Sequence, residues 1–144
     1  MSTLQEIADR VEIAALQAEY TDAVMMHDFD RLAGLFTSDA VISIPDAGIE
    51  LAGRERIRSA SQQLQARWAF FVQNTHAGYV RVDEDSASGR AYVVEFGDID
   101  GGSELNYSIY HDRYRRTSEG WRFVERVYEV RYRDTTALTG VAVP

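Results

Sequence analysis

The sequence contains no cysteine, which excludes disulfides, thiolate nucleophiles and thiolate metal sites. It also contains no lysine, because all fifteen basic residues are arginine. Without lysine, no side chain can form a Schiff base with a substrate or with pyridoxal phosphate, and a P-loop is excluded. Arginine stays protonated, so it can hold an anion but rarely acts as a base. The candidate general bases are therefore the carboxylates, the tyrosines and three histidines, His27, His76 and His111.

Long apolar runs and clustered positive charge are also missing. The longest uncharged apolar stretch, near residues 68–72, is far too short to span a bilayer. The amino terminus lacks the layout of a signal peptide, so we expect a cytoplasmic protein with no membrane partner. A net charge of −8 argues against a nucleic-acid partner. Long charged side chains normally stay solvated, so we interpret the arginines near the end of the chain as a solvated outer sheet face. These are Arg113, Arg115, Arg116, Arg122, Arg126, Arg131 and Arg133.

What is present suits one globular domain over residues 1–144. The chain has the size of an ordinary domain, and 45% of its residues are hydrophobic. A chain of this length can bury roughly two-thirds of the surface that its unfolded form exposes. No internal repeat, linker or low-complexity tract interrupts it.

The order of the predicted elements favours an α+β fold. Apolar residues at helical spacing predict a helix over residues 4–27, and Asp28 is a good N-cap for a second helix that ends near Phe36. A strand over residues 39–44 and a third helix over about 53–67 follow. Four alternating runs then predict antiparallel strands at about 68–83, 88–97, 103–116 and 121–133. Helices followed by long strands indicate three helices packed on one face of a curved sheet.

Three stretches resemble the SnoaL-like family, which belongs to the nuclear-transport-factor-2-like class. They are Ile13-Ala-Ala-Leu-Gln-Ala-Glu-Tyr20 with residues 27–40, then Leu51-Ala-Gly-Arg-Glu-Arg-Ile57, and the predicted last hairpin over residues 110–123. The resemblance implies a cone-shaped domain whose strongly curved, mixed and mainly antiparallel sheet encloses an apolar small-molecule pocket. The family includes polyketide cyclases, scytalone-type dehydratases and limonene-epoxide-type hydrolases, so the fold alone does not select the reaction.

Family members that dehydrate or isomerise use a tyrosine on the first helix, an aspartate five residues later and a histidine on the strand after the third helix. Tyr20 matches the tyrosine. The aspartate position falls on Met25 and the histidine position on Thr75, with His76 next to it. The aspartate–histidine dyad is therefore absent as a sequence pattern.

Strand alternation makes His76 a candidate catalytic residue. It shares parity with Val80 and Val82, so it should point to the interior, either into the pocket or as a core histidine bound to a backbone carbonyl. Tyr20 lies on the apolar stripe of the first helix, where its hydroxyl needs a buried partner or a cavity. We interpret His27 and His111 as surface or structural residues.

Other candidates lie on the predicted strands. Glu95 ends an apolar run, where it is either a buried base with a raised pKa or a strand-end charge. Asn106, Ser108 and Tyr110 share one face, which is either solvated or able to hydrogen-bond a carbonyl or enolate oxygen. Glu125 lies two residues past Phe123, on the same predicted face, and is a weaker candidate. Predicted apolar walls, which plain core packing explains equally well, are Val24, Met25, Phe36, Trp68 and Phe70.

The main hypothesis is a cofactor-independent, polyketide cyclase-like enzyme of secondary metabolism. It would cyclise a hydrophobic carbonyl or polyene substrate, with His76, Tyr20 or Tyr110 polarising a carbonyl. One alternative is a dehydratase or isomerase that uses His76 and Tyr20 as acid and base. Another is a non-catalytic small-molecule-binding module, and a third is epoxide hydrolysis. No metal site is supported, because the histidines lack the spacing of zinc motifs.

Two features of the surface are also predicted. The outer sheet face of the last strand should carry a row of apolar residues, Tyr128, Val130 and Tyr132. We expect a homodimer that buries this row. The segment 97–103 contains three glycines and two aspartates, so we expect it to form a mobile lip over the pocket mouth.

Overall fold

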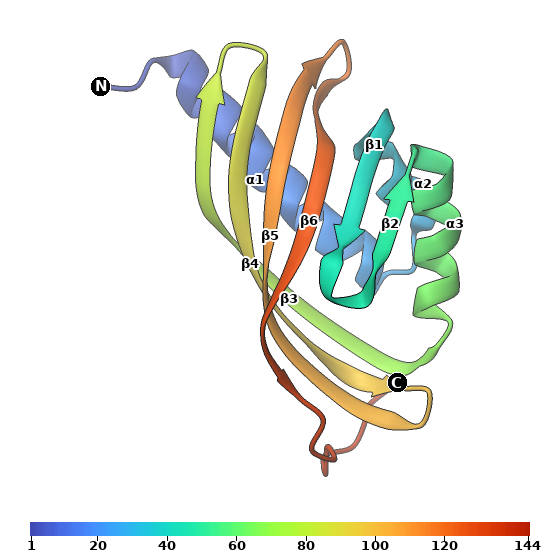
Figure 1. Cartoon of the computed structure of the whole chain (residues 1–144). Coiled ribbons are helices and arrows are strands. Elements are labelled where there is room, and N and C mark those ends of the chain that lie inside the picture. The colour runs from blue at the N-terminus through green and yellow to red at the C-terminus, as the bar shows by residue number, and fades with distance from the viewer.

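A computed structural model describes residues 1–144 as three helices and one six-stranded sheet (Figure 1). The elements are α1 (Leu4–Met25), α2 (Phe29–Gly34), β1 (Phe36–Ile44), the 3-10 turn η1 (Pro45–Ala47), β2 (Ile49–Ala52), α3 (Arg54–Gln65), β3 (Trp68–Asp83), β4 (Ser86–Ile99), β5 (Gly102–Thr117) and β6 (Gly120–Asp134). The predicted α+β class is confirmed. The short strand β2 was not predicted, because Pro45 and the turn after it end the apolar pattern there.

The strand order is β2-β1-β6-β5-β4-β3. All neighbours are antiparallel except β1 and β6, which are parallel, so the sheet is mixed and mainly antiparallel as expected. In Figure 1, α1 lies behind the long strands, and α3 lies beside the β1–β2 hairpin. The lower halves of β3, β4 and β5 bend beneath that hairpin and close the cone.

Helix α1 begins and ends where its local chemistry requires. Thr3 and Glu6 form a capping box, in which the Thr3 hydroxyl accepts from the Glu6 amide (3.1 Å) and the Glu6 carboxylate accepts from the Thr3 amide (3.1 Å). The buried stripe of the helix includes Ile13, Leu16 and Tyr20. The helix ends at Met25, because His27 has a left-handed backbone (φ 55°), so the predicted end at residue 27 was two residues too late.

Four bulged residues interrupt the long strands, and each inserts one residue without a partner. They are Ala69 and Gly78 on β3, and Val124 and Arg131 on β6. A bulge reverses the alternation of side chains, so residues of the same parity on its two sides face opposite sides of the sheet. Every prediction that carried strand parity across one of these four positions therefore has the wrong face.

Two glycines of β4 permit the close approach of β3 beside its bulges. A Cβ on Gly89 would lie 2.3 Å from the Tyr79 carbonyl oxygen, and one on Gly97 would lie 2.1 Å from the Phe70 carbonyl oxygen. Real Cβ atoms do not approach backbone oxygens so closely, so only glycine fits at these positions. Glycine inside a strand pattern is a recognised mark of a bulge or close backbone approach.

The segment 97–103 is mostly paired strand, and its mobility as a lip over the pocket mouth stays a prediction. Residues 97–99 belong to β4 and residues 102–103 to β5, with Asp100 (φ 52°) and Gly101 (φ 83°) as the two-residue turn. Two positive φ values in sequence suit the tight turn of a twisted hairpin. The Arg67 guanidinium forms an ion pair with Asp100 and so ties the turn to the end of α3.

The core contains one arginine that the sequence placed on the solvated face. Arg126 is fully buried, because the bulge at Val124 turns it to the concave side of the sheet. Its guanidinium pairs with Asp112, from Nε to Oδ1 at 2.7 Å and from Nη2 to Oδ2 at 3.1 Å. At the other end of the cone, buried Asp9 accepts two hydrogen bonds from Arg116 and one from the Trp121 indole. None of the helices is both long and apolar enough to cross a membrane.

Candidate functional site

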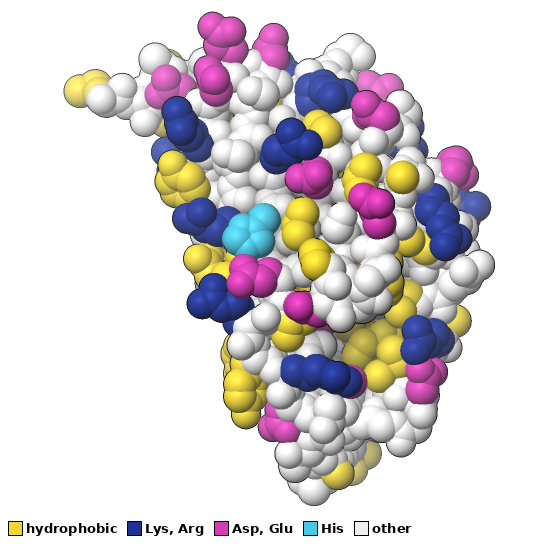
Figure 2. All heavy atoms as spheres, in the orientation of Figure 1, with side chains coloured by type: hydrophobic (Ala, Val, Ile, Leu, Met, Phe, Trp, Pro, Cys, Tyr) yellow, Lys and Arg dark blue, Asp and Glu magenta, His cyan; other side chains and the backbone are white.

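A cavity of about 120 Å³ lies between α1, α3 and the concave face of the sheet. In Figure 2 a hollow with hydrophobic walls opens below the β1–β2 hairpin. Its lining comes from seven elements, so only the folded chain assembles it. The lining residues are Tyr20, Val24, Ile42, Ile44, Ser61, Leu64, Gln65, Trp68, Phe71, Gln73, Glu95, Tyr110 and Tyr128.

Glu95 is the only carboxylate of this lining. Its Oε1 accepts a hydrogen bond from the Tyr128 hydroxyl, and its Oε2 accepts one from the Gln73 amide at 3.0 Å. Burial raises the pKa of Glu95 above its ordinary value, while the contacts with Tyr128, Gln73 and Asn106 oppose part of that rise. A carboxyl group with a raised pKa beside an apolar cavity is suited to taking up a proton and returning it.

Gln73 holds Glu95 in place, and sequence reasoning missed it. Thr21 Oγ1 lies 2.8 Å from Gln73 Oε1, which can only accept, so the amide nitrogen must face Glu95 and, at 3.4 Å, the Tyr110 hydroxyl. The available signal was an amide directly after the apolar run 68–72, at the parity of Thr75.

The two positions of the missing dyad support the same glutamine. Met25 Sδ lies 3.3 Å from the Gln73 backbone nitrogen, and Thr75 Oγ1 lies 2.8 Å from Thr21 Oγ1. Neither a thioether nor a threonine hydroxyl is a competent base at neutral pH. Met25 was predicted as a cavity wall, but it packs against β3 and does not line the cavity.

Three tyrosines surround the carboxylate. The ring of Tyr110 packs edge-on against Tyr20 at 5.6 Å and against Tyr128 at 5.3 Å between centroids. Burial raises the pKa of all three hydroxyls above the ordinary value, so they remain protonated and serve as hydrogen-bond donors. Tyr20 and Tyr110 thus lie on the cavity wall as the sequence predicted, although their catalytic role stays a prediction.

Tyr128 and Val130 do not form the predicted outer row. Tyr128 is 6% exposed in the cone, and Val130 packs against the core, because the bulge at Val124 turns both inward. The second bulge, at Arg131, turns the strand again, so Tyr132 alone of the three is exposed on the outer face.

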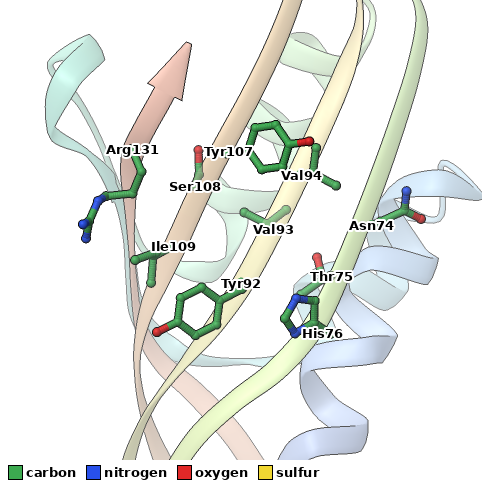
Figure 3. A pocket seen from close by; sticks show the side chains of 10 residues that line it. All are labelled: Asn74, Thr75, His76, Tyr92, Val93, Val94, Tyr107, Ser108, Ile109 and Arg131. Atoms are coloured by element: carbon green, nitrogen blue, oxygen red, sulfur yellow. The ribbon is translucent and has the colours of Figure 1, made fainter.

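His76 points away from the cone, which corrects the prediction that it faces the interior. The bulge at Gly78 separates it from Val80, so these two residues face opposite sides of β3. His76 is exposed and stacks on Tyr92, with 5.9 Å between ring centroids. Figure 3 shows the two rings side by side, with α1 behind the strands. Thr75 instead faces α1.

The outer groove that contains His76 has a larger volume, about 740 Å³, than the cone cavity. It is an open surface across β3 to β6, lined by Tyr92, Tyr107 and Arg131 among others (Figure 3). No buried carboxylate or buried tyrosine hydroxyl faces it. The smaller cone cavity has the better-formed chemistry and is the candidate active site.

The same bulges displace two further predicted site residues. Phe70 lies on the outer face against Phe96, at 6.4 Å between centroids, because Ala69 is bulged, and Phe71 lines the cavity in its place. Glu125 faces outward and pairs with Arg113, because Val124 is bulged between it and Phe123.

The remaining predicted residues lie on the concave side. Val24, Trp68 and Glu95 line the cavity. Asn106 and Ser108 pair with Glu95 and Val93 of the neighbouring strand β4. Asn106 Oδ1 and Ser108 Oγ are buried without a hydrogen-bond partner in the protein. Phe36 is a core residue under Tyr20 and Phe123, so it supports the cavity wall without forming it.

This cone of helices on a curled, mixed sheet with one buried cavity defines an NTF2-like domain. The chain belongs to the SnoaL-like family, since residues 5–127 match the model of the SnoaL-like domain. An uncharacterised protein of Mycobacterium tuberculosis is 32% identical over 133 residues, which is 88% of each chain.

The chain is also similar to solved structures, two of which are compared with it by sequence identity and TM-score. One, from Novosphingobium aromaticivorans and provisionally described as an aromatic ring hydroxylase, is 28% identical with a TM-score of 0.82, over 90% of this chain and 94% of the other. The other is the type 3 hexachlorocyclohexane dehydrochlorinase of Novosphingobium barchaimii, 23% identical with a TM-score of 0.82 over 99% of each chain.

Proposed function

We propose that this protein is an enzyme of the lyase or isomerase class that transfers a proton on a small hydrophobic carbonyl compound. Glu95 is the proton acceptor and donor, and the Tyr20 and Tyr110 hydroxyls hydrogen-bond the carbonyl oxygen. The observation that carries the proposal is the buried carboxylate of Glu95 on the wall of a mostly apolar and aromatic cavity.

The geometry supports a simple sequence of steps. The Glu95 carboxylate removes a proton from the carbon next to the carbonyl, so a C–H bond breaks, an O–H bond forms on Glu95, and the electron pair moves to the carbonyl oxygen as an enolate. The two tyrosine hydroxyls stabilise that charge. Protonated Glu95 then returns the proton to another carbon, which is isomerisation, or to a departing hydroxyl group, which is dehydration.

The volume of the cavity limits the substrate. A cavity of about 120 Å³ is somewhat smaller than an apolar cavity of about 150 Å³ that takes benzene, so it suits a compound of about one ring. Polyketide cyclisation stays a narrower prediction within the same chemistry, because ring closure by an enolate carbon would use the same three residues. A long polyene would require the cone to widen. The scheme needs no cofactor.

Proton exchange tests the proposal without knowledge of the natural substrate. Cyclohexanone in D₂O exchanges the protons beside its carbonyl, and proton NMR follows their loss. The wild type should accelerate this exchange, and Glu95→Gln should reduce the acceleration by about a hundred- to ten-thousandfold, as for loss of a general base. Glu125→Gln is the matched control, because it removes a carboxylate from the outer face of the same sheet.

Two results would contradict the proposal. Full exchange activity in Glu95→Gln would show that another group moves the proton. Tight binding of cyclohexanone by the wild type with no acceleration would favour the alternative of a non-catalytic small-molecule-binding module.

A further inference from the structure

The buried Arg126–Asp112 pair lies directly under the two tyrosines of the cavity. The Arg126 guanidinium carbon is 3.6 Å from the ring centroid of Tyr110 and 4.4 Å from that of Tyr20. Both members of the ion pair are fully buried. Arg126 therefore contacts the rings of both proposed oxygen-binding residues, one from α1 and one from β5, without lining the cavity itself.

Stability alone is a weak reason for this arrangement. Removing two charges from water costs several kcal/mol per ion, and apolar residues of similar volume often stabilise a core equally well or better. The Asp112 carboxylate is also held by the Tyr114 hydroxyl (2.8 Å), which in turn accepts from Gln17 at 2.6 Å. Arg126 Nη1 has no hydrogen-bond partner in the protein. Tyr114 and Gln17 thus hold the ion pair in place, and the guanidinium faces the aromatic rings.

We propose that Arg126 is a positioning residue, which orients the Tyr20 and Tyr110 rings and directs positive charge towards the substrate oxygen that their hydroxyls bind. The inference rests on the proposed function and deepens it. It defines the substrate class as planar carbonyl compounds that pass through an enolate, because a flat anionic oxygen is what a pair of hydroxyls backed by a cation would favour. Phenolates of one ring have the same shape and charge.

The ionisation of the neighbouring groups is consistent with this role. Burial alone would lower the pKa of Arg126, but Asp112 raises it and the net pKa lies above the ordinary value, so the guanidinium keeps its charge. Burial raises the pKa of Tyr20 and Tyr110, and the Arg126 charge opposes that rise. Both hydroxyls thus remain donors, made more acidic by the cation than burial alone would leave them.

The test uses two double variants on adjacent rungs of the same two strands. Asp112 pairs with Arg126 on the inner face, and Arg113 pairs with Glu125 on the outer face. Arg126→Met with Asp112→Leu removes the inner pair and keeps apolar volume, while Arg113→Met with Glu125→Leu is the matched control. In the cyclohexanone exchange, the inner double variant should lose about ten- to a hundredfold in kcat, while its KM should change less than about threefold. The loss in kcat should not exceed that caused by removing a residue that donates a hydrogen bond directly to the oxyanion. The control should match the wild type.

A binding measurement separates this inference from the proposed function. In a Glu95→Gln background, the anionic form of 4-nitrophenol is titrated by its absorbance, and neutral nitrobenzene is titrated by competition. The inner double variant should bind 4-nitrophenolate about tenfold less tightly and nitrobenzene equally well. This result would support the role of Arg126 even if the wild type failed to exchange cyclohexanone protons, which would count against the proposed function alone.

Arg126→Lys covers the case in which the double variant fails to fold. Lysine keeps the charge but lacks the planar fork that both pairs with Asp112 and stacks on the rings. It should lose at least about threefold in kcat and in 4-nitrophenolate affinity, with a cooperative thermal melt. Wild-type kcat and wild-type 4-nitrophenolate affinity in either folded inner variant would overturn the inference and leave the pair a purely structural one.

Discussion

At the scale of single residues, the site depends on where one carboxylate is buried. Glu95 sits at the end of an apolar run, and the sequence left open whether it was a buried base or a strand-end charge. The structure places it among Gln73, Tyr110 and Tyr128 inside the cone. Its environment comes from β3, β5 and β6, so no local pattern around residue 95 could determine it.

The burial of Glu95 should make folding stability depend on pH in a defined direction. Its pKa in the folded protein is raised above its ordinary value of 4.5, so the folded state favours the protonated form. Its contribution to stability is then complete below pH 4.5 and is lost as the pH rises through the folded-state value. Glu95→Gln does not titrate, so its melting temperature relative to the wild type should increase as the pH rises from 4.5. Each unit of pKa shift corresponds to about 1.4 kcal/mol.

Asp9 supplies a control of opposite sign. Its hydrogen bonds from Arg116 are the main cause that lowers its pKa below the ordinary value of 3.8. It contributes stability above pH 3.8 that is lost as the pH falls further. Asp9→Asn should therefore be destabilised most near neutral pH and approach the wild type in acid. Thermal melts of all three proteins between pH 3 and 8 check both signs, and a pH-independent difference for Glu95→Gln would contradict the buried carboxylate.

At the scale of elements, the bulges decide which residues face the cone. Strand alternation was correct within each uninterrupted stretch, and it failed at Ala69, Gly78, Val124 and Arg131. A helix was easier to predict, because the stripe of α1 continues without interruption from Ile13 to Val24. Gly89 and Gly97, inside a strand pattern, were the available signs of irregular pairing.

The glycines beside the β3 bulges give a test of this role. Gly97→Ala would place a Cβ 2.1 Å from the Phe70 carbonyl oxygen, which β3 could relieve only by moving. We expect a loss of about 1–3 kcal/mol in the free energy of unfolding, as for other overpacking substitutions. Gly102→Ala is the control, because its nearest backbone neighbour is 3.8 Å away and its backbone is not left-handed. Equal denaturation midpoints for the two variants would contradict the close approach.

At the scale of the whole molecule, the homodimer stays a prediction, but its surface is not the predicted row. The exposed aromatic residues of the outer sheet face are Tyr79, Tyr92, Tyr107 and Tyr132, which are 39–58% exposed. Tyr107 and Tyr132 pack edge-on at 6.3 Å beside the groove of Figure 3. Aromatic residues gathered on one face of a sheet are typical of an interface between subunits.

Light scattering at micromolar concentration should therefore give about twice the chain mass of 16.3 kDa. Tyr107→Glu places a charge in the middle of the outer face and should produce monomers. These monomers should keep their fold, which a cooperative thermal melt would show. Val11→Glu is the control, because Val11 is also exposed, at 64%, but lies on α1, on the other side of the sheet. A wild type of 16.3 kDa, or dimers that persist in Tyr107→Glu, would contradict an interface on this face.

The sequence by itself determined the order and type of the helices and long strands and the resemblance to the family, because helix periodicity, caps and turn residues act over a few neighbouring positions. Only the tertiary structure decided which side chains meet in the cavity. One unpaired residue in a strand reverses every side chain beyond it, which moved His76 and Glu125 out of the cone and brought Tyr128 and Arg126 into it. The raised pKa of Glu95 likewise comes from burial by elements far apart in the chain, and only the folded sheet brings those elements together.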